Sequence, residues 1–276
     1  MSKNIVVIGA GVYGAAVTAE LARRGASVTV VDAGVPGGGT SGATFAWTNA
    51  NGAKEPKAYH DLNVAGMEAH QSLATSVPGS DWYHEVGTLK WGGDDTERAD
   101  LRRKVNLVLG YGYEARWLTR AEALALEPEL NPAELPDDEI AYFPTEGWVA
   151  PTRLIGHLLS TSGAARVWND AVVGFDVTGD RVRSVQLASG RALPADAVVN
   201  CAGPRAADIA QLVGLDLPMQ NTRGVLVHTS PIALATTRVI QAPNIHLRPD
   251  GAGRLQLHSY DSDASAHVSD TGEITV

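Results

Sequence analysis

Three glycines and one aspartate near the start of the sequence have a spacing that can serve chemistry. Gly9, Gly11 and Gly14 form a GxGxxG motif, and Asp32 follows the last of them by 18 residues. The first glycine of such a motif permits a sharp turn, the second lets the backbone approach a pyrophosphate, and the third lets a helix pack against a strand. An acid at Asp32 can bind ribose hydroxyls and disfavours a 2′-phosphate. The motif therefore predicts a dinucleotide site, with NADP the least favoured occupant.

The elements around the motif are those that such a site requires. Residues 5–8 are a continuous apolar run, typical of a strand that is buried on both faces. Residues 15–24 have helical spacing and end before Gly25, and residues 27–31 form a second apolar strand. This is a βαβ unit, and the N-terminus of its helix presents free N–H groups to phosphates.

The segment after Asp32 favours FAD over NAD. Residues 37–44 are a run of small residues, where a NAD dehydrogenase would start another crossover helix. Such a loop can lie along a long cofactor, with Thr40 and Ser41 donating to the pyrophosphate. Residues 198–204 are a strand that ends in a small-residue turn, which can lie against the same dinucleotide. A NAD-dependent dehydrogenase is the competing interpretation that this loop disfavours.

The remaining pattern alternates helices and strands, which predicts an α/β fold. Residues 55–76 read as a helix with Leu62, Ala65, Ala69 and Leu73 on one face. Residues 259–276 show no helical pattern. The other helices are expected at 97–109, 151–159 and 206–213, with a further one opening at a capping box formed by Thr119 and Glu122. The strands are expected at 87–91, 167–173, 182–187, 197–200, 224–229, 245–248 and 254–258.

Composition excludes several classes of function. The chain has 276 residues and a net charge of −9, so it lacks the basic footprint of a general nucleic-acid binder. One cysteine, Cys201, excludes an intramolecular disulfide, and we expect it to be a small core residue. No apolar run reaches the length of a membrane span. No histidine has the spacing of a metal ligand, so we expect no metal. These features favour a cytoplasmic enzyme.

The sequence resembles the D-amino-acid oxidase, glycine oxidase and sarcosine oxidase superfamily of FAD-dependent oxidoreductases. The resemblance extends over nearly the whole chain, in segments that occur in the expected order: residues 5–32, 39–47, 87–90, 118–128, 146–159, 166–173, 198–204 and 223–227. It implies a discontinuous Rossmann-like FAD-binding domain, residues 1–50 plus 146–215. It also implies a mixed-sheet substrate domain, residues 51–145 plus 216–276.

The resemblance implies a set of cofactor-binding residues. The pyrophosphate, the ribose, the flavin ring and the adenine edge would each have partners in this set, and Asp32 stands where the family more often has Glu. Covalent attachment is not expected, because no His or Cys occupies an obvious tethering position. The predicted residues are Gly9, Ala10, Gly11, Val12, Tyr13, Gly14, Asp32, Ala33, Thr40, Ser41, Ala43, Thr44, Ala46, Trp47, Val172, Cys201, Ala202 and Gly203.

Two residues on one predicted strand are the candidates for contact with the substrate. His246 and Arg248 alternate around Leu247, so their side chains face the same way, and Arg248 could grip a carboxylate. Relatives continue past this region and add an arginine and a last FAD segment. The chain ends at Val276, so we expect the substrate domain to be incomplete at its C-terminus.

Two hypotheses of different class follow. The first is an FAD-dependent oxidoreductase that oxidises the C–N bond of an amino acid or secondary amine of the D-amino-acid, glycine or sarcosine type. Hydride transfer to flavin N5 would give an imine that hydrolyses, with oxygen or a quinone as the electron acceptor. The second is a catalytically inactive FAD-binding fragment or scaffold. The sequence leaves the substrate and the oligomeric state open.

Overall fold

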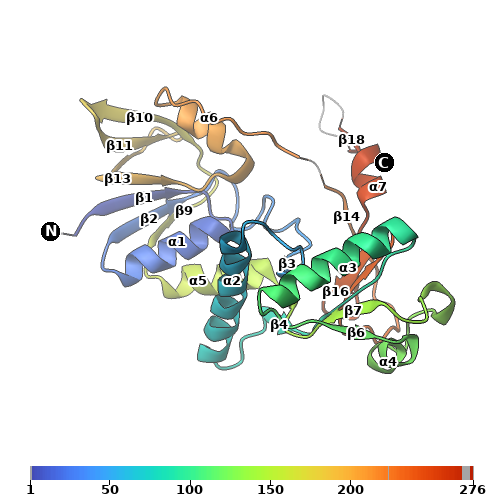
Figure 1. Ribbon diagram of the computed structural model, residues 1–276. Coiled ribbons are helices and arrows are strands. Elements are labelled where there is room, and N and C mark those ends of the chain that lie inside the picture. The colour runs from blue at the N-terminus through green and yellow to red at the C-terminus, as the bar shows by residue number, and fades with distance from the viewer. Residues whose placement is uncertain (1, 223, 269–273, 276) are drawn as a thin grey trace. The chain divides into compact units, whose positions relative to one another are not determined.

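The computed structural model describes residues 2–222, 224–268 and 274–275, and the chain forms two compact units (Figure 1). Unit 1 comprises residues 1–44 and 151–222, and unit 2 comprises residues 45–150 and 223–276. Both units mix helices with strands, so the fold is the expected α/β class.

The chain leaves unit 1 after Thr44, earlier than the expected boundary at residue 50. The reason lies in strand pairing: Trp47 pairs with Trp148, and Val149 N donates to Ala46 O at 2.9 Å. Unit 2 therefore includes residues 45–50. It also includes residues 146–150, and the last crossing falls after Thr222 instead of residue 215. The functional assignment of the two units stays a prediction.

Unit 1 is built around a four-stranded parallel sheet in the order β13-β1-β2-β9. Val7 packs with Ala15 of helix α1 and Ile155 of helix α5 on one face, while Val6 packs with Val185 on the other. Both faces are covered, which explains the continuous apolar runs. The elements of unit 1 are β1 (Asn4–Ile8), α1 (Val12–Arg23), β2 (Ser27–Val31), α5 (Pro151–Thr161), β9 (Ala165–Val167), β10 (Val172–Thr178), β11 (Arg181–Leu187), β12 (Ala192–Pro194), β13 (Ala197–Asn200), η2 (Gly203–Arg205) and α6 (Ala206–Gln211).

The strand expected over residues 167–173 is in fact two strands in different sheets. β9 ends the parallel sheet, and β10 begins the antiparallel β10-β11-β12 sheet. The chain breaks between them because Asn169 has φ 55°, and its N–H donates to Gly34 O. A left-handed residue cannot continue an extended strand.

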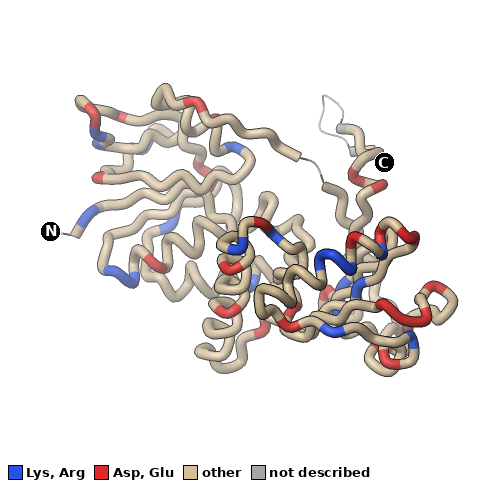
Figure 2. The backbone as a smooth tube through the Cα atoms, in the orientation of Figure 1, with Lys and Arg blue, Asp and Glu red and all other residues tan. Residues whose placement is uncertain are grey.

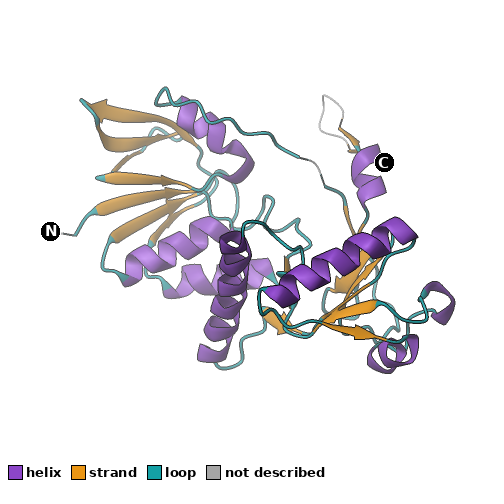
Figure 3. Cartoon of the chain, in the orientation of Figure 1, coloured by secondary structure: helices purple, strands orange, loops and turns teal. Residues whose placement is uncertain are grey.

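Unit 2 contains a seven-stranded mixed sheet in the order β14-β17-β16-β15-β5-β7-β6, and a three-stranded sheet β3-β8-β4 (Figure 3). Helix α3 packs Leu101 and Val105 on Phe143 of β7, and a second core lies around Leu89 and Ile240. The elements are β3 (Trp47–Thr48), α2 (Lys57–Ser76), β4 (Tyr83–Glu85), β5 (Thr88–Lys90), α3 (Asp95–Gly110), β6 (Arg116–Leu118), α4 (Arg120–Leu126), η1 (Pro132–Glu134), β7 (Ile140–Phe143), β8 (Gly147–Val149), β14 (Leu226–His228), β15 (Val239–Ala242), β16 (Ile245–Pro249), β17 (Leu255–His258), α7 (Tyr260–Ser265), β18 (His267–Val268) and β19 (Ile274–Thr275).

Two local predictions in unit 2 are wrong. The buried residues of α2 are His60 and Met67, whereas Leu62, assigned to the apolar face, is 68% exposed. His60 contacts the rings of Tyr111 and Tyr113, so a polar residue marks the inner face. Helix α7 lies in a segment expected to have no helix. Its acidic first turn suits a helix N-terminus.

Candidate functional site

The glycine turn of unit 1 has the geometry that the motif predicts. Gly9 has φ 100°, and a Cβ added there would lie 2.2 Å from Cys201 O. A Cβ at Gly14 would lie 1.8 Å from Gly9 O, so the helix approaches the strand too closely for any side chain. These two positions accept only glycine, and they place the start of α1 directly after β1.

The N-terminus of α1 has no side-chain cap from its own N-cap residue. Gly11 is its N-cap and provides no side-chain acceptor, and Val12 N instead donates to Ser41 Oγ at 3.0 Å. A Cβ at Gly11 would lie 3.0 Å from the same Ser41 oxygen. The serine hydroxyl thus lies at the positive end of the helix, where phosphate oxygens are favoured.

Asp32 follows β2 and is held by the main chain. Its Oδ2 accepts from Ala10 N at 2.7 Å and its Oδ1 from Gly34 N at 2.8 Å. This carboxylate therefore ties the glycine turn to the loop that follows it. Each oxygen keeps a lone pair that can accept from a hydroxyl.

The small-residue loop after Asp32 is compact. Gly37 N donates to Ala10 O at 3.0 Å, and Ala43 N donates to Thr40 O at 3.1 Å. A Cβ at Gly42 would lie 2.4 Å from Gly37 O, which explains the glycines of this segment. The loop folds onto the same turn as Asp32 and brings Ser41 to the helix.

A third turn completes this side of unit 1. Cys201 follows β13 and donates its N–H to Ile8 O at 2.7 Å, and Ala202 N donates to Asn200 Oδ1. Burial raises the pKa of the Cys201 thiol, so it stays protonated and behaves as a core residue. Val172 begins β10 and packs, half-buried, on the core that includes Val31. Gly9, Asp32 and Cys201 thus follow adjacent parallel strands, where open α/β sheets bind ligands.

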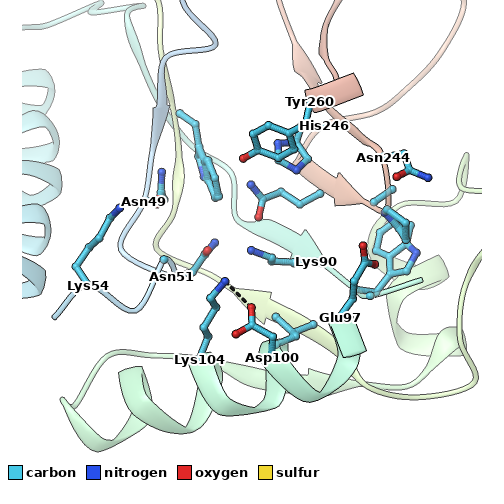
Figure 4. Close-up of a pocket in the computed structure, with 18 of the residues that line it drawn as sticks. Asn49, Asn51, Lys54, Lys90, Glu97, Asp100, Lys104, Asn244, His246 and Tyr260 are labelled. Carbon is cyan, nitrogen blue, oxygen red and sulfur yellow. Dashed lines mark ion pairs between the residues drawn. The ribbon is translucent and has the colours of Figure 1, made fainter. Parts of the chain in front are cut away.

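Unit 2 contains a pocket of about 750 Å³, lined by residues from the 47–54 segment, α2, β5, α3, β15, β16 and α7 (Figure 4). Lys90 pairs in register with Gln241, Gln241 with His246, and His246 with His258. Register partners project to the same face of a sheet. A polar row therefore crosses strands β5, β15, β16 and β17, and its first three members line the pocket.

His246, predicted on the substrate side, lies in this pocket. Burial, then Lys90, then His258 lower its pKa to about 4, so it is neutral near pH 7. Its ring lies 6.5 Å from Trp47 and 5.3 Å from Tyr260 between centroids. The structure thus brings together His246 and Trp47, which the sequence assigned to opposite partners, substrate and flavin.

Arg248, predicted to bind a substrate carboxylate, is held by two main-chain oxygens and by Asp250. Arg248 is 2% exposed and does not line the pocket. Its Nε donates to Phe45 O, and its Nη1 donates to Pro249 O at 2.7 Å and pairs with Asp250 at 3.4 Å. The guanidinium lies over the Trp148 ring. It therefore fixes the Phe45 segment against β16. Alternation along the strand predicts that Arg248 shares a face of β16 with His246, but it does not predict these main-chain acceptors.

The sequence did not single out Glu146 as a candidate residue. Glu146 is 0% exposed and accepts from Ala50 N, from Asn51 N and Nδ2, and from Tyr113 Oη at 3.1 Å. Burial raises its pKa to about 7, against hydrogen bonds from Thr88 and the 50–51 segment. A lone acid in the apolar stretch 140–150 was the available signal.

The described residues provide neither a cluster of metal ligands nor a membrane-spanning helix. No group of three or more His, Cys, Asp or Glu is arranged to hold a metal ion. No helix in the described ranges is long and apolar enough to cross a membrane.

Comparison with known proteins gives consistent matches. The family model described as FAD dependent oxidoreductase (DAO) matches residues 4–275. The glycine oxidase of Geobacillus kaustophilus is 29% identical over 262 residues, which cover 92% of this chain and 69% of that protein. The tRNA 5-methylaminomethyl-2-thiouridine biosynthesis bifunctional protein MnmC of Chromohalobacter salexigens is 29% identical. That match covers 98% of this chain and 38% of the relative, so the chain spans only part of each protein.

Two crystal structures extend the comparison. Glycine oxidase from Geobacillus kaustophilus superposes with a TM-score of 0.82 at 26% identity, covering 98% of this chain and 75% of that one. Iminodiacetate oxidase from Chelativorans sp. BNC1 gives 0.76 at 26% identity, covering 97% and 75%.

Proposed function

Because the chain belongs to the FAD dependent oxidoreductase (DAO) family, whose cofactor is FAD, we propose that it oxidises the C–N bond of an amino acid or secondary amine. The observation that carries the proposal is the cradle formed by the turns after β1, β2 and β13 in unit 1. Glycine oxidase and iminodiacetate oxidase, whose names give amine substrates, support the substrate class.

The residues of unit 1 fit the pyrophosphate and ribose of FAD. The N–H groups of the first turn of α1 and the Ser41 hydroxyl would bind phosphate oxygens, and Asp32 would accept from ribose hydroxyls. The further contacts that we propose are Ala10, Tyr13, Ala33, Thr40, Ala43, Thr44, Val172, Ala202 and Gly203 in unit 1, and Ala46 and Trp47 in unit 2.

When bound, FAD would supply the oxidation, as the acceptor of the hydride from the carbon next to the substrate nitrogen. The chain's part is to bind and orient the substrate. His246 is neutral near pH 7, so it adds no positive charge next to a protonated amine. We propose noncovalent FAD and oxygen or a quinone as the acceptor.

An RNA substrate is less favoured. The chain has a net charge of −9, and Figure 2 shows lysines and arginines scattered among acidic residues in both units. RNA binding needs basic residues gathered on one face.

The test is a flavin spectrum followed by anaerobic addition of amines. We expect the purified protein to bind FAD, to release it on acid denaturation, and to lose its flavin colour with glycine, sarcosine, D-alanine or iminodiacetate. A protein that binds FAD but is reduced by no amine would instead be an inactive FAD-binding module. A protein that takes up no FAD would refute the proposal.

A further inference from the structure

Two buried amide oxygens of the unit 2 pocket have no hydrogen-bond partner among the described residues. They are Asn51 Oδ1 and Gln241 Oε1, and each residue is 2% exposed. A buried acceptor without a donor costs free energy, so such atoms call for an explanation. Both residues line the pocket, where a ligand N–H could reach them.

Hydrogen bonds to Glu146 fix the orientation of the Asn51 amide. Its Nδ2 donates to Glu146 Oε2 at 2.8 Å, and its main-chain N donates to Oε1 at 2.9 Å. Because Nδ2 is the donor in this hydrogen bond, the amide nitrogen faces Glu146. The amide oxygen is therefore turned away from Glu146.

Lys90 provides a positive charge in the same pocket. No carboxylate of the described residues forms an ion pair with it, and the nearby Asp100 pairs with Lys104 at 2.5 Å. Burial and the nearby Lys104 lower the Lys90 pKa. Figure 4 shows its side chain extending toward Asn51 and Lys104.

The other cations near the pocket are less suited to bind an anion. Lys104 already pairs with Asp100, and Arg248 is held by main-chain oxygens and by Asp250. Lys54 is exposed, and its Nζ lies 5.6 Å from the centroid of the Tyr59 ring. Gln241 is the register partner of Lys90, so one acceptor lies beside the lysine on the same face of the sheet.

We propose that this pocket binds an amino acid, with Lys90 Nζ on its carboxylate and Asn51 Oδ1 and Gln241 Oε1 accepting from its amine. One cation and two acceptors complement a zwitterion. The assignment rests on the proposed function for its meaning in catalysis. Trp47 lines the same pocket, and the family resemblance places Trp47 beside the flavin ring.

Binding can be separated from oxidation with 2-aminoisobutyrate, an amino acid that has no Cα–H to transfer. Its primary amide lacks the carboxylate, and trimethylacetate has a methyl group in place of the amine. Calorimetric titration of the FAD-loaded protein with these three probes should rank 2-aminoisobutyrate first. Flavin reduction by glycine, sarcosine and D-alanine is measured separately.

Two variants test which residue binds the carboxylate and which binds the amine. Lys90→Met keeps the aliphatic stem and should weaken 2-aminoisobutyrate binding about tenfold or more, while binding of its amide is unchanged. Gln241→Met should reduce the preference for 2-aminoisobutyrate over trimethylacetate. The control is Lys57→Met, a lysine of unit 2 that pairs with Asp61 outside the pocket and should bind all probes as the parent does.

The outcomes separate the two proposals. If amines reduce the flavin but Lys90→Met binds 2-aminoisobutyrate as tightly as the parent, the binding assignment is wrong and the function stands. If Lys90-dependent binding is found without flavin reduction, the assignment stands and the function fails. If the parent does not prefer 2-aminoisobutyrate over its amide and trimethylacetate, the assignment is overturned.

Discussion

Asn51 donates twice to Glu146, from its main-chain N to Oε1 at 2.9 Å and from its side-chain Nδ2 to Oε2 at 2.8 Å. Ala50 N and Tyr113 Oη donate to the same carboxylate. One buried side chain directly before β8 thus fixes the position of the 50–51 segment. The pocket acceptor on Asn51 depends on an acid that does not itself line the pocket.

Glu146→Ala should therefore destabilise unit 2 strongly. The change leaves at least four donors without their acceptor in a buried site, and we expect a loss of about 3 kcal/mol or more in the free energy of unfolding. Urea denaturation measures it. Glu129→Ala, at an exposed position, is the control and should stay within about 0.5 kcal/mol of the parent. An equal effect of the two changes would contradict the role of Glu146.

The raised pKa of Glu146 predicts a pH dependence. Its folded-state value of about 7 lies above the ordinary 4.5, so its contribution to stability is present below pH 4.5 and is lost as the pH rises through 7. Glu146→Gln removes this titration. The parent-minus-variant difference in unfolding free energy should fall between pH 4.5 and 7 and then level off. A difference that does not change with pH would show that Glu146 titrates normally.

The site of unit 1 could be predicted because its requirements are local. Gly9, Gly11 and Gly14 are needed by one turn, and Asp32 follows the next strand of the same βαβ unit. These residues are therefore close together in the sequence as well as in the structure. Ser41 was predicted as well, from the small-residue loop, and the structure adds that its hydroxyl accepts from Val12 N.

The pocket of unit 2 could not be predicted in the same way. Lys90 and Gln241 are partners only because β5 and β15, far apart in sequence, pair in parallel. Nothing in either strand alone encodes that register. The contacts of Arg248 are likewise not encoded locally, since alternation gave its face of the strand but not the Phe45 and Pro249 carbonyls that bind it.

Alanine substitutions in the glycine turn should separate folding from FAD binding. Gly14→Ala would bring a Cβ to 1.8 Å from Gly9 O, so we expect a loss of about 3 kcal/mol or more and no FAD uptake. Gly11→Ala meets only the Ser41 hydroxyl, at 3.0 Å. It should reduce FAD affinity by about tenfold, with a stability change under about 1 kcal/mol.

The control for both is Gly156→Ala in helix α5, where no atom lies within 4 Å of the added Cβ. This variant should gain about 0.5–1 kcal/mol and bind FAD normally. Unfolding curves and FAD titrations give both readouts. Tight FAD binding by Gly14→Ala would refute the geometry of the turn.

Asp32→Asn should weaken FAD binding because it disturbs the turns that form the FAD cradle. One amide N–H₂ would face the N–H of Ala10 or Gly34, where the carboxylate now accepts from both. We expect a loss of about 1–3 kcal/mol in stability and at least tenfold in FAD affinity. Asp196→Asn, which affects a single exposed contact to Asn4 N, is the matched control. Unchanged FAD affinity in Asp32→Asn would remove Asp32 from the site.

His246 should titrate far below an ordinary histidine. Burial, Lys90 and His258 lower its pKa to about 4, so its contribution to stability is present above pH 6.5 and is lost as the pH falls through 4. NMR titration of its ring protons should show a neutral imidazole from pH 6 to 8. Lys90→Met should raise the His246 pKa, because the positive charge opposing protonation is gone, whereas Lys57→Met should leave it unchanged. A His246 that titrates near 6.5 in the parent protein would contradict its burial beside Lys90 in the pocket.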